Sequence, residues 1–91
     1  MKETNERIAK TFDELKEFVI QKNIDYNNSL QNPISVFQTT KMNGILGRLD
    51  DKLNRIKASG INENTIDTVD DLIGYLVHLK LMYEDDKKKL F

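Results

Sequence analysis

Residues 67 to 78 carry two chemically opposite surfaces on one predicted helix. At about 100° per residue, one side gathers Asp67, Asp71 and His78. The opposite side holds apolar residues, namely Val69, Leu72, Ile73, Leu76 and Leu79. An amphipathic helix buries its apolar side against other elements, so this segment commits the chain to a packed helical fold. Carboxylates one turn apart can hold a hard cation or act as acid and base, which makes the polar side the first candidate for chemistry.

A second helix is predicted over residues 4 to 23. Apolar residues recur there at spacings of three and four, as Ile8, Phe12, Leu15 and Val19. This stripe predicts a helix that faces the core. Turn formers follow, and the only proline, Pro33, is expected to end regular helix. A polar connection is predicted from 28 to 44, and three apolar residues within it form a short helix or fill a gap: Ile34, Val36 and Phe37.

A further helix is predicted from about residue 42 to 57. Its inner side is expected to hold Leu46, Leu49, Leu53 and Ile56. Gly60 suits a left-handed helix end, and Thr65 is a candidate N-cap for the helix that continues to about Tyr83. Residues 84–91 form a charge run, expected to be a solvated and fraying tail. The sequence therefore predicts one all-α domain over residues 1–91, a small bundle of three principal helices.

The length of 91 residues limits the core that one copy can build. A chain this short buries only about 60 to 65% of its unfolded surface, so a homodimer or higher homo-oligomer is expected to complete the core. The absence of cysteine excludes thiolate metal sites and fits a reducing compartment.

Charge and hydropathy limit the kinds of partner that the chain can bind. Fourteen basic residues nearly balance 15 acidic ones, so no extended nucleic-acid surface is expected and any phosphate recognition must be local. No apolar run approaches the ~18 residues of a membrane span, and the first residues lack a signal peptide's hydrophobic stretch. We expect a soluble, cytoplasmic protein without a membrane partner.

The predicted helix over 42 to 57 has a charged side away from its leucines. Arg48 and Lys52 share this side with Asp51 and Arg55, with spacings that suit ordinary intrahelical ion pairs. Taken alone, a solvated face explains them. Likewise, acids such as Asp67 and Asp71 are common near a helix N-terminus because the helix dipole stabilises them. A lone histidine such as His78 is more often structural than catalytic.

Another polar cluster follows the first predicted helix. It consists of Lys22, Asp25, Tyr26 and Ser29, which share one side if the helix persists and form a polar corner near its C-terminus if it breaks. Lysine supplies a point charge for phosphate, tyrosine a ring or hydroxyl, and aspartate a hard oxygen ligand. Three short polar clusters on three helices exceed what solvation requires, which favours a shared site.

Three blocks of the sequence carry a family resemblance. They are Lys22-Asn-Ile-Asp-Tyr-Asn-Asn-Ser29, Gly44-Ile-Leu-Gly-Arg-Leu-Asp-Asp-Lys-Leu-Asn-Arg-Ile56 and Glu63-Asn-Thr-Ile-Asp-Thr-Val-Asp-Asp-Leu-Ile-Gly-Tyr75. Over residues 12 to 83 the chain resembles the nucleotide modification associated domain 1 family, small helical proteins of phages and bacteria. That family in turn resembles the all-α MazG-like NTP pyrophosphohydrolases. The resemblance implies a cytoplasmic nucleotide-binding protein, in the host cytoplasm if a phage encodes it.

In the wider superfamily, an EExxE helix and a following ExxD helix hold Mg²⁺ against nucleotide phosphates, usually within a dimer. This chain keeps Asp50 and Asp51 in the first of these helices, and Asp71 takes the final position of the second. Thr68 stands at the Glu position of ExxD, and basic residues replace other acids. These changes weaken binding of bare Mg²⁺ and favour direct capture of phosphate by Arg48, Lys52 and Arg55.

The enzymatic interpretation is a Mg²⁺-dependent nucleoside triphosphate pyrophosphohydrolase. Its metal-binding and catalytic residues would be Asp51, Asp67 and Asp71, with Asp25 as a further oxygen donor. Its nucleotide-binding residues would be Lys22, Asp25, Tyr26, Arg48, Lys52 and Arg55. Two alternatives remain: a non-catalytic protein that sequesters a nucleotide as a sponge or sensor, and a plain protein-interaction bundle. Base, sugar, phosphate number and oligomer size stay open.

Overall fold

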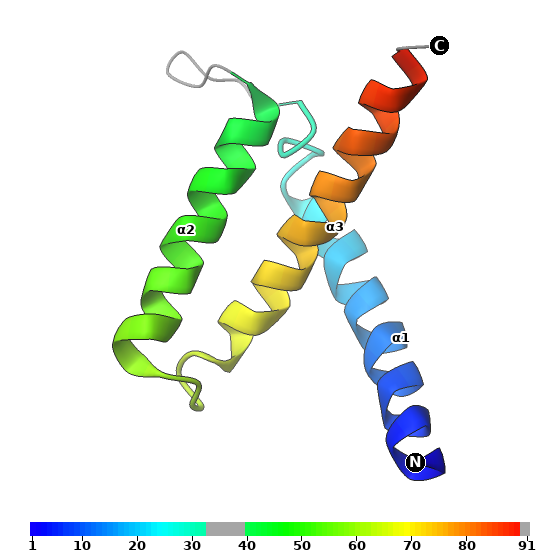
Figure 1. Cartoon of the computed structure of the whole chain (residues 1–91), viewed down its shortest axis with the longest axis vertical. Coiled ribbons are helices and arrows are strands. Elements are labelled where there is room, and N and C mark those ends of the chain that lie inside the picture. Colours follow the sequence, from blue (N-terminus) through cyan, green and yellow to red (C-terminus); the bar gives the residue numbers. More distant parts are fainter. Residues whose placement is uncertain (33–39, 90–91) are drawn as a thin grey trace.

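The computed structural model describes residues 1–32 and 40–89, and these form three α-helices without a strand (Figure 1). Helix α1 spans Lys2–Asp25, α2 spans Lys41–Ser59 and α3 spans Ile66–Lys89. The predicted all-α fold is confirmed. The predicted contributions of Ile34, Val36 and Phe37 fall outside the described residues.

The end of α1 follows from its local sequence. Asn27 and Asn28 adopt left-handed backbone conformations, with φ of 52° and 58°, which asparagine tolerates better than most residues. The Asn28 N–H donates to the carbonyl oxygen of Asn23 at 2.9 Å and closes the last turn. The chain therefore leaves the helix before Pro33, as the turn formers predict.

Side chains and a glycine define both ends of α2. At its start, the Thr40 hydroxyl accepts a hydrogen bond from the Asn43 N–H at 3.0 Å. At its end, Gly60 has φ of 71° and donates its N–H to the Ile56 carbonyl at 2.7 Å. The Thr65 hydroxyl then donates to the Gly60 carbonyl and accepts from the Asn62 N–H, which ties the α2–α3 turn together.

Helix α3 is the central element. It runs antiparallel to α2, while the C-terminal half of α1 crosses its other side (Figure 1). Gly74 lies at the crossing with α1, where an added Cβ would make ordinary van der Waals contact with the Val19 Cγ2 atom at 3.5 Å. Helices α1 and α2 each pack on α3 and remain apart from each other, which leaves a space between them.

The α2–α3 core differs from the predicted one. Ile45 of α2 and Met82 of α3 are the buried hydrophobic residues of the described chain, each 1% exposed. Leu46 and Leu53, predicted to face inward, are 48% and 55% exposed, so that part of the prediction is wrong. The buried side of α2 is rotated by about one residue, because Ile45 rather than Leu46 meets α3.

The predicted core stripe of α1 is only partly covered. Leu15 and Val19 are half-buried, whereas Ile8 and Phe12 are 49% and 66% exposed. The reason is the crossing geometry: α1 meets α3 with its C-terminal half, and its N-terminal half extends away from both other helices (Figure 1). Within one chain, therefore, the first half of the stripe has no core to face.

Helix α3 continues six residues beyond its predicted end at Tyr83, through Lys89. The segment contains no Gly or Pro, and Glu and Lys are good helix formers, so helix propensity explains the extension. No helix among the described residues is long and apolar enough to cross a membrane.

Candidate functional site

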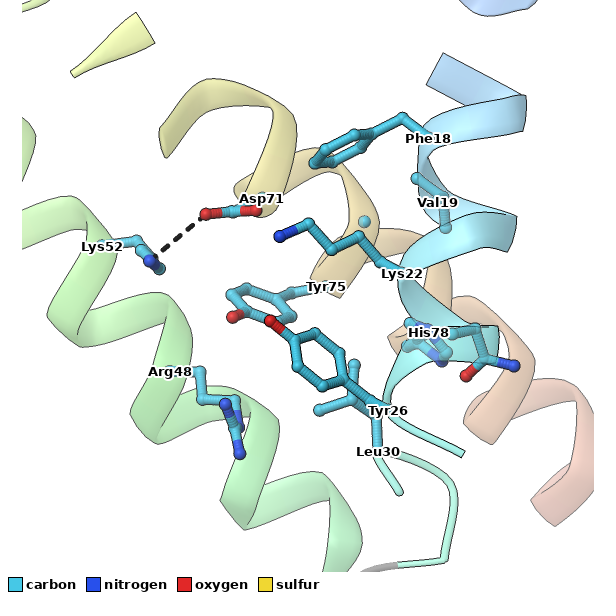
Figure 2. Close-up of a pocket in the computed structure, with 12 residues that line it drawn as sticks. Phe18, Val19, Lys22, Tyr26, Leu30, Arg48, Lys52, Asp71, Tyr75 and His78 are labelled. Carbon is cyan, nitrogen blue, oxygen red and sulfur yellow. Dashed lines mark ion pairs between the residues drawn. The ribbon is translucent and has the colours of Figure 1, made fainter. Parts of the chain in front are cut away.

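A cavity of about 290 Å³ opens between α1 and α2, with α3 as its floor (Figure 2). Helix α1 and the turn after it contribute Phe18, Val19, Lys22, Asn23, Tyr26 and Leu30. Helix α2 contributes Arg48 and Lys52, and α3 contributes Asp71, Gly74, Tyr75 and His78. The missing side chain of Gly74 leaves open space in this floor. The cavity exists because α1 and α2 share α3 as a support without touching each other.

Lys22 enters the cavity between two aromatic rings. Its ammonium nitrogen lies 5.5 Å from the ring centroid of Phe18 and 5.7 Å from that of Tyr26. Both distances are within the range of cation–π attraction. The three residues are spaced four apart, with Phe18 and Lys22 on α1 and Tyr26 as its C-cap, so successive turns place them in one row. The rings hold the ammonium group in the cavity without neutralising its charge.

Lys52 and Asp71 face each other across the cavity. The Lys52 Nζ atom lies 3.2 Å from the Asp71 Oδ2 atom, and their side chains are 18% and 24% exposed (Figure 2). This ion pair joins α2 to α3. It also places the cavity's single carboxylate against a lysine, which lowers the negative potential that a bound anion would meet.

Arg48 stands one helical turn before Lys52 and is exposed. In the described part of the chain it forms no ion pair, and neither does Lys22. Among the described residues that line the cavity, three cationic side chains and one carboxylate give a net charge of +2, with His78 neutral. The whole chain carries a net charge of −1, so the positive charge is a local property of this cavity.

His78 closes one end of the cavity and is 6% exposed. Its Nδ1 atom lies 2.9 Å from the Gln31 Nε2 atom, and the same amide group donates to the His78 carbonyl at 3.3 Å. The Lys41 ammonium donates to Gln31 Oε1 at 3.4 Å. Burial lowers the pKa of His78, because the charged imidazolium loses hydration. A neutral ring that accepts at Nδ1 fits this network.

Asn23 lines the cavity and carries an unsatisfied acceptor. Its Oδ1 atom is buried and has no hydrogen-bond partner among the described residues. Buried polar atoms are nearly always paired, so this oxygen is unusual, but neighbouring side chains must move before a ligand or water can donate to it. An N–H group is the chemical complement of this oxygen.

The structure brings five of the predicted site residues into this one cavity: Lys22, Tyr26, Arg48, Lys52 and Asp71. They come from three helices that are far apart in the sequence. Lys22 of α1 and Tyr26, the C-cap of α1, lie one turn apart, as do Arg48 and Lys52 on α2, so each pair projects to one side.

Four predicted residues lie elsewhere. Asp51 and Arg55 line a separate open hollow beside the α2–α3 turn, and Asp25, which is exposed, accepts a hydrogen bond from Gln21 Nε2 at 2.9 Å. Asp67 is exposed and does not line the cavity. Helical geometry explains the separation: Asp51 is rotated about 100° from Lys52, and Arg55 lies about 10 Å further along α2 than Arg48.

The acidic residues are correspondingly dispersed. Within residues 1–32 and 40–89, no three side chains of the Asp, Glu or His type are grouped closely enough to hold a metal ion together. Asp51, Asp67 and Asp71 are therefore not such a group in the described part of one chain. Asp70 adds a further acid next to them. Its pKa is raised by partial burial and by the nearby charges of Asp67 and Asp71.

Several cavity residues were absent from the predicted site. Phe18 and Val19 were assigned to the core, and His78 to a structural role. The residue types of Tyr75 and Asn23 did not mark them as site residues. Their position in the sequence was the one available signal, because Tyr75 follows Asp71 by one turn and Asn23 is adjacent to Lys22. The tertiary structure determines which sides of the helices meet, and therefore which residues line the cavity.

The arrangement suits recognition of an anion attached to a flat ring. Lys22, Arg48 and Lys52 offer donors and positive charge, while Tyr26 and Tyr75 offer aromatic surface (Figure 2). No family model matches this chain, and neither a curated protein nor a solved structure is detectably similar to it.

Proposed function

We propose that this protein binds a nucleotide in the cavity between α1 and α2 by direct contact between its cationic side chains and phosphate oxygens. The observation that carries the proposal is the combination of net positive charge and aromatic walls in one cavity. Arginine and lysine are the usual direct ligands of phosphate, and arginine adds a bidentate fork.

The roles divide between the cavity's two kinds of side chain. Arg48 and Lys22 lack ion-pair partners in the described part of the chain, so each is available for a phosphate without first breaking a contact. Tyr26 and Tyr75 would contact the base or sugar.

Sequestration without turnover fits this set of residues better than hydrolysis. A metal-assisted phosphoryl transfer needs carboxylates that hold the ion against the phosphates, and Asp71 is the cavity's single carboxylate. Asp71 is also paired with Lys52. Mg²⁺-dependent hydrolysis is the second candidate, and the presence of Asp71 in the cavity is the observation in its favour. The homo-oligomer predicted from the chain length is compatible with both sequestration and hydrolysis.

Isothermal titration calorimetry with nucleoside mono-, di- and triphosphates and with cyclic dinucleotides tests binding directly. We expect binding of at least one class that survives EDTA, because protein cations rather than a metal hold the phosphate. Release of pyrophosphate from triphosphates in the presence of Mg²⁺ would instead select the hydrolytic candidate.

A matched pair of variants locates the site. Arg48 and Arg55 are both exposed arginines of α2, but Arg48 lines the cavity and Arg55 does not. Replacing Arg48 by Gln removes a charged hydrogen bond of about 1.5 to 3 kcal/mol, so affinity should fall about 10- to 100-fold. Arg55→Gln should leave affinity nearly unchanged. Equal losses in the two variants would contradict the proposed location.

A further inference from the structure

The N-terminal half of α1 is an apolar surface without a cover in one chain. Residues 1 to 14 are all exposed, including Ile8 and Phe12, and Figure 1 shows this half of α1 extending away from α2 and α3. An isolated helix of this length is marginal in water, because most helical stability in proteins comes from packing of an apolar face. Packing of another surface on this stripe would therefore stabilise this half of α1.

The apolar stripe of α1 lies on a different side of the helix from most of its charged residues. At about 100° per residue, Ile8, Phe12 and Leu15 fall on one side of α1. Most charged residues of this region gather on the opposite side, namely Glu3, Glu6, Arg7, Lys10, Asp13, Glu14 and Glu17, whereas Lys16 lies at the edge of the stripe. The Thr11 hydroxyl, at the edge of the stripe, donates to the Arg7 carbonyl at 2.8 Å and so does not need water. This pattern is that of a helix side built for a dry contact.

The stripe continues into a groove on the same side of the molecule. A hollow of about 240 Å³ lies between α1 and α3, lined by Phe12, Leu15, Lys16, Val19, Ile20 and Val77. Five of the six lining side chains are hydrocarbon or aromatic, and Leu76 beside Val77 is 52% exposed. An exposed aromatic ridge and an apolar groove thus adjoin each other on one surface.

The solvent-accessible surface area of the chain indicates how much surface a partner could cover. A compact monomer of 10.6 kDa is expected to expose about 5,500 Å², whereas this chain exposes 7490 Å². Its radius of gyration is 15.2 Å, against about 12 Å for a compact domain of this length. The surplus of about 2,000 Å² per chain matches the area that each subunit of an obligate homodimer buries.

We infer that a second copy of this chain covers this surface, with the α1 stripes of the two copies packed against each other about a two-fold axis. Each Phe12 then sits against the partner's groove between α1 and α3. A two-fold contact uses the same patch twice, so a patch that holds both the ridge and the groove suits self-association. The adjoining apolar surface of α3 would be covered by the same contact.

The interface has a consequence for the nucleotide cavity, although it does not depend on that site. Phe18 and Lys22 of the cavity lie on α1 directly after the stripe. Packing of two α1 helices would therefore hold the helix that carries them. Self-association without nucleotide binding would leave this inference standing, and nucleotide binding by a monomer would overturn it.

Sedimentation velocity of the full chain at micromolar concentration tests the inference. We expect the wild-type protein to sediment as a dimer or a closed oligomer of dimers. Phe12→Glu should weaken self-association at least about a hundredfold, because an aromatic anchor at the centre of an interface is lost from both subunits. The matched control is Ile24→Glu, since Ile24 is 64% exposed on α1 but lies off the stripe. A monomeric wild type, or a Phe12→Glu variant that associates as well as Ile24→Glu, would overturn the inference.

Cross-linking keeps the test decisive if Phe12→Glu fails to fold. The chain has no cysteine, so single cysteines can be introduced without background. A short bismaleimide should join two chains of a Thr11→Cys variant, because Thr11 borders the stripe, and should not join chains of Lys10→Cys, on the opposite side. Equal cross-linking at both positions, or none at Thr11→Cys, would contradict the proposed surface.

Discussion

Lys52 Nζ lies 3.2 Å from Asp71 Oδ2, so the predicted phosphate ligand and the predicted metal ligand bind each other across the cavity. The pair links α2 to α3 next to the space in which an anion would sit. Because a carboxylate repels phosphate, Asp71 limits the positive charge that Lys52 can offer. The same residue therefore has opposite expected effects in the two candidate functions.

Replacing Asp71 by Asn distinguishes sequestration from hydrolysis. If side-chain cations bind the phosphate directly, the variant should bind nucleotide more tightly by about 1 kcal/mol, roughly fivefold, because a nearby negative charge is removed. If Asp71 holds Mg²⁺, the variant should lose Mg²⁺-dependent binding and turnover. Calorimetry with and without EDTA measures both, and circular dichroism checks that the fold survives. Weaker binding in EDTA would count against direct capture by cations.

The burial of His78 predicts a loss of stability in mild acid. Its folded-state pKa is lowered below the ordinary value of 6.5, so the unfolded chain takes up the proton first. The free energy of unfolding should therefore be unaffected by this group above pH 6.5 and should decrease as pH falls through 6.5 toward the lowered pKa. Urea unfolding between pH 7.5 and 5 measures the slope.

A His78→Gln variant provides the control for that slope. Glutamine can accept from the Gln31 amide but does not titrate, so the decrease below pH 6.5 should flatten. The raised pKa of Asp70 acts in the opposite direction at lower pH. Its folded form takes up the proton first, which adds stability as pH falls through the raised pKa toward 3.8. An unchanged slope in His78→Gln would show that another group causes the pH dependence.

Gly74→Ala should stabilise the protein, although Gly74 lies at the crossing of α1 and α3. A Cβ there would meet Val19 Cγ2 at 3.5 Å, which is an ordinary van der Waals contact. Removing a glycine from a helix interior raises stability by about 0.5 to 1 kcal/mol. Thermal unfolding measures the change.

Gly47→Ala is the matched control, because a Cβ on Gly47 would meet nothing within 4 Å. The two variants should gain similar stability. Only Gly74→Ala alters the cavity floor, so only it should change nucleotide affinity. Destabilisation by Gly74→Ala alone would mean that the helix crossing does not tolerate an added methyl group.

The rotated core of α2 predicts unequal costs at two adjacent positions. Ile45→Ala should destabilise the fold by about 2 to 5 kcal/mol, because Ile45 is 1% exposed and its truncation leaves a cavity against α3. Leu46→Ala should cost much less, since Leu46 is 48% exposed. Urea denaturation of both variants gives the comparison. A larger loss of unfolding free energy for Leu46→Ala would mean that Leu46 faces the core, as predicted from the sequence, or lies in an intermolecular contact.

Local signals in the sequence were sufficient for the three helices and for the ends of α1 and α2. The three-four spacing of apolar residues, the paired asparagines after α1 and Gly60 after α2 each act through neighbouring residues. Such signals do not depend on the rest of the fold, so the elements and the turn at 27–28 agree with prediction. The end of α3 differs from the prediction because the helix propensity of its charged residues extends it to Lys89.

Tertiary structure decided which sides of those helices meet. Periodicity shows that a helix has an apolar side, but it does not show that α1 crosses α3 at Gly74 and leaves Phe12 uncovered. The crossing directs Lys22 toward Arg48 and Lys52, while Asp51 and Arg55 lie at a separate hollow. Residue types and spacing thus determined the candidates for phosphate binding, and helix packing, which acts between residues distant in the chain, determined which of them share one cavity.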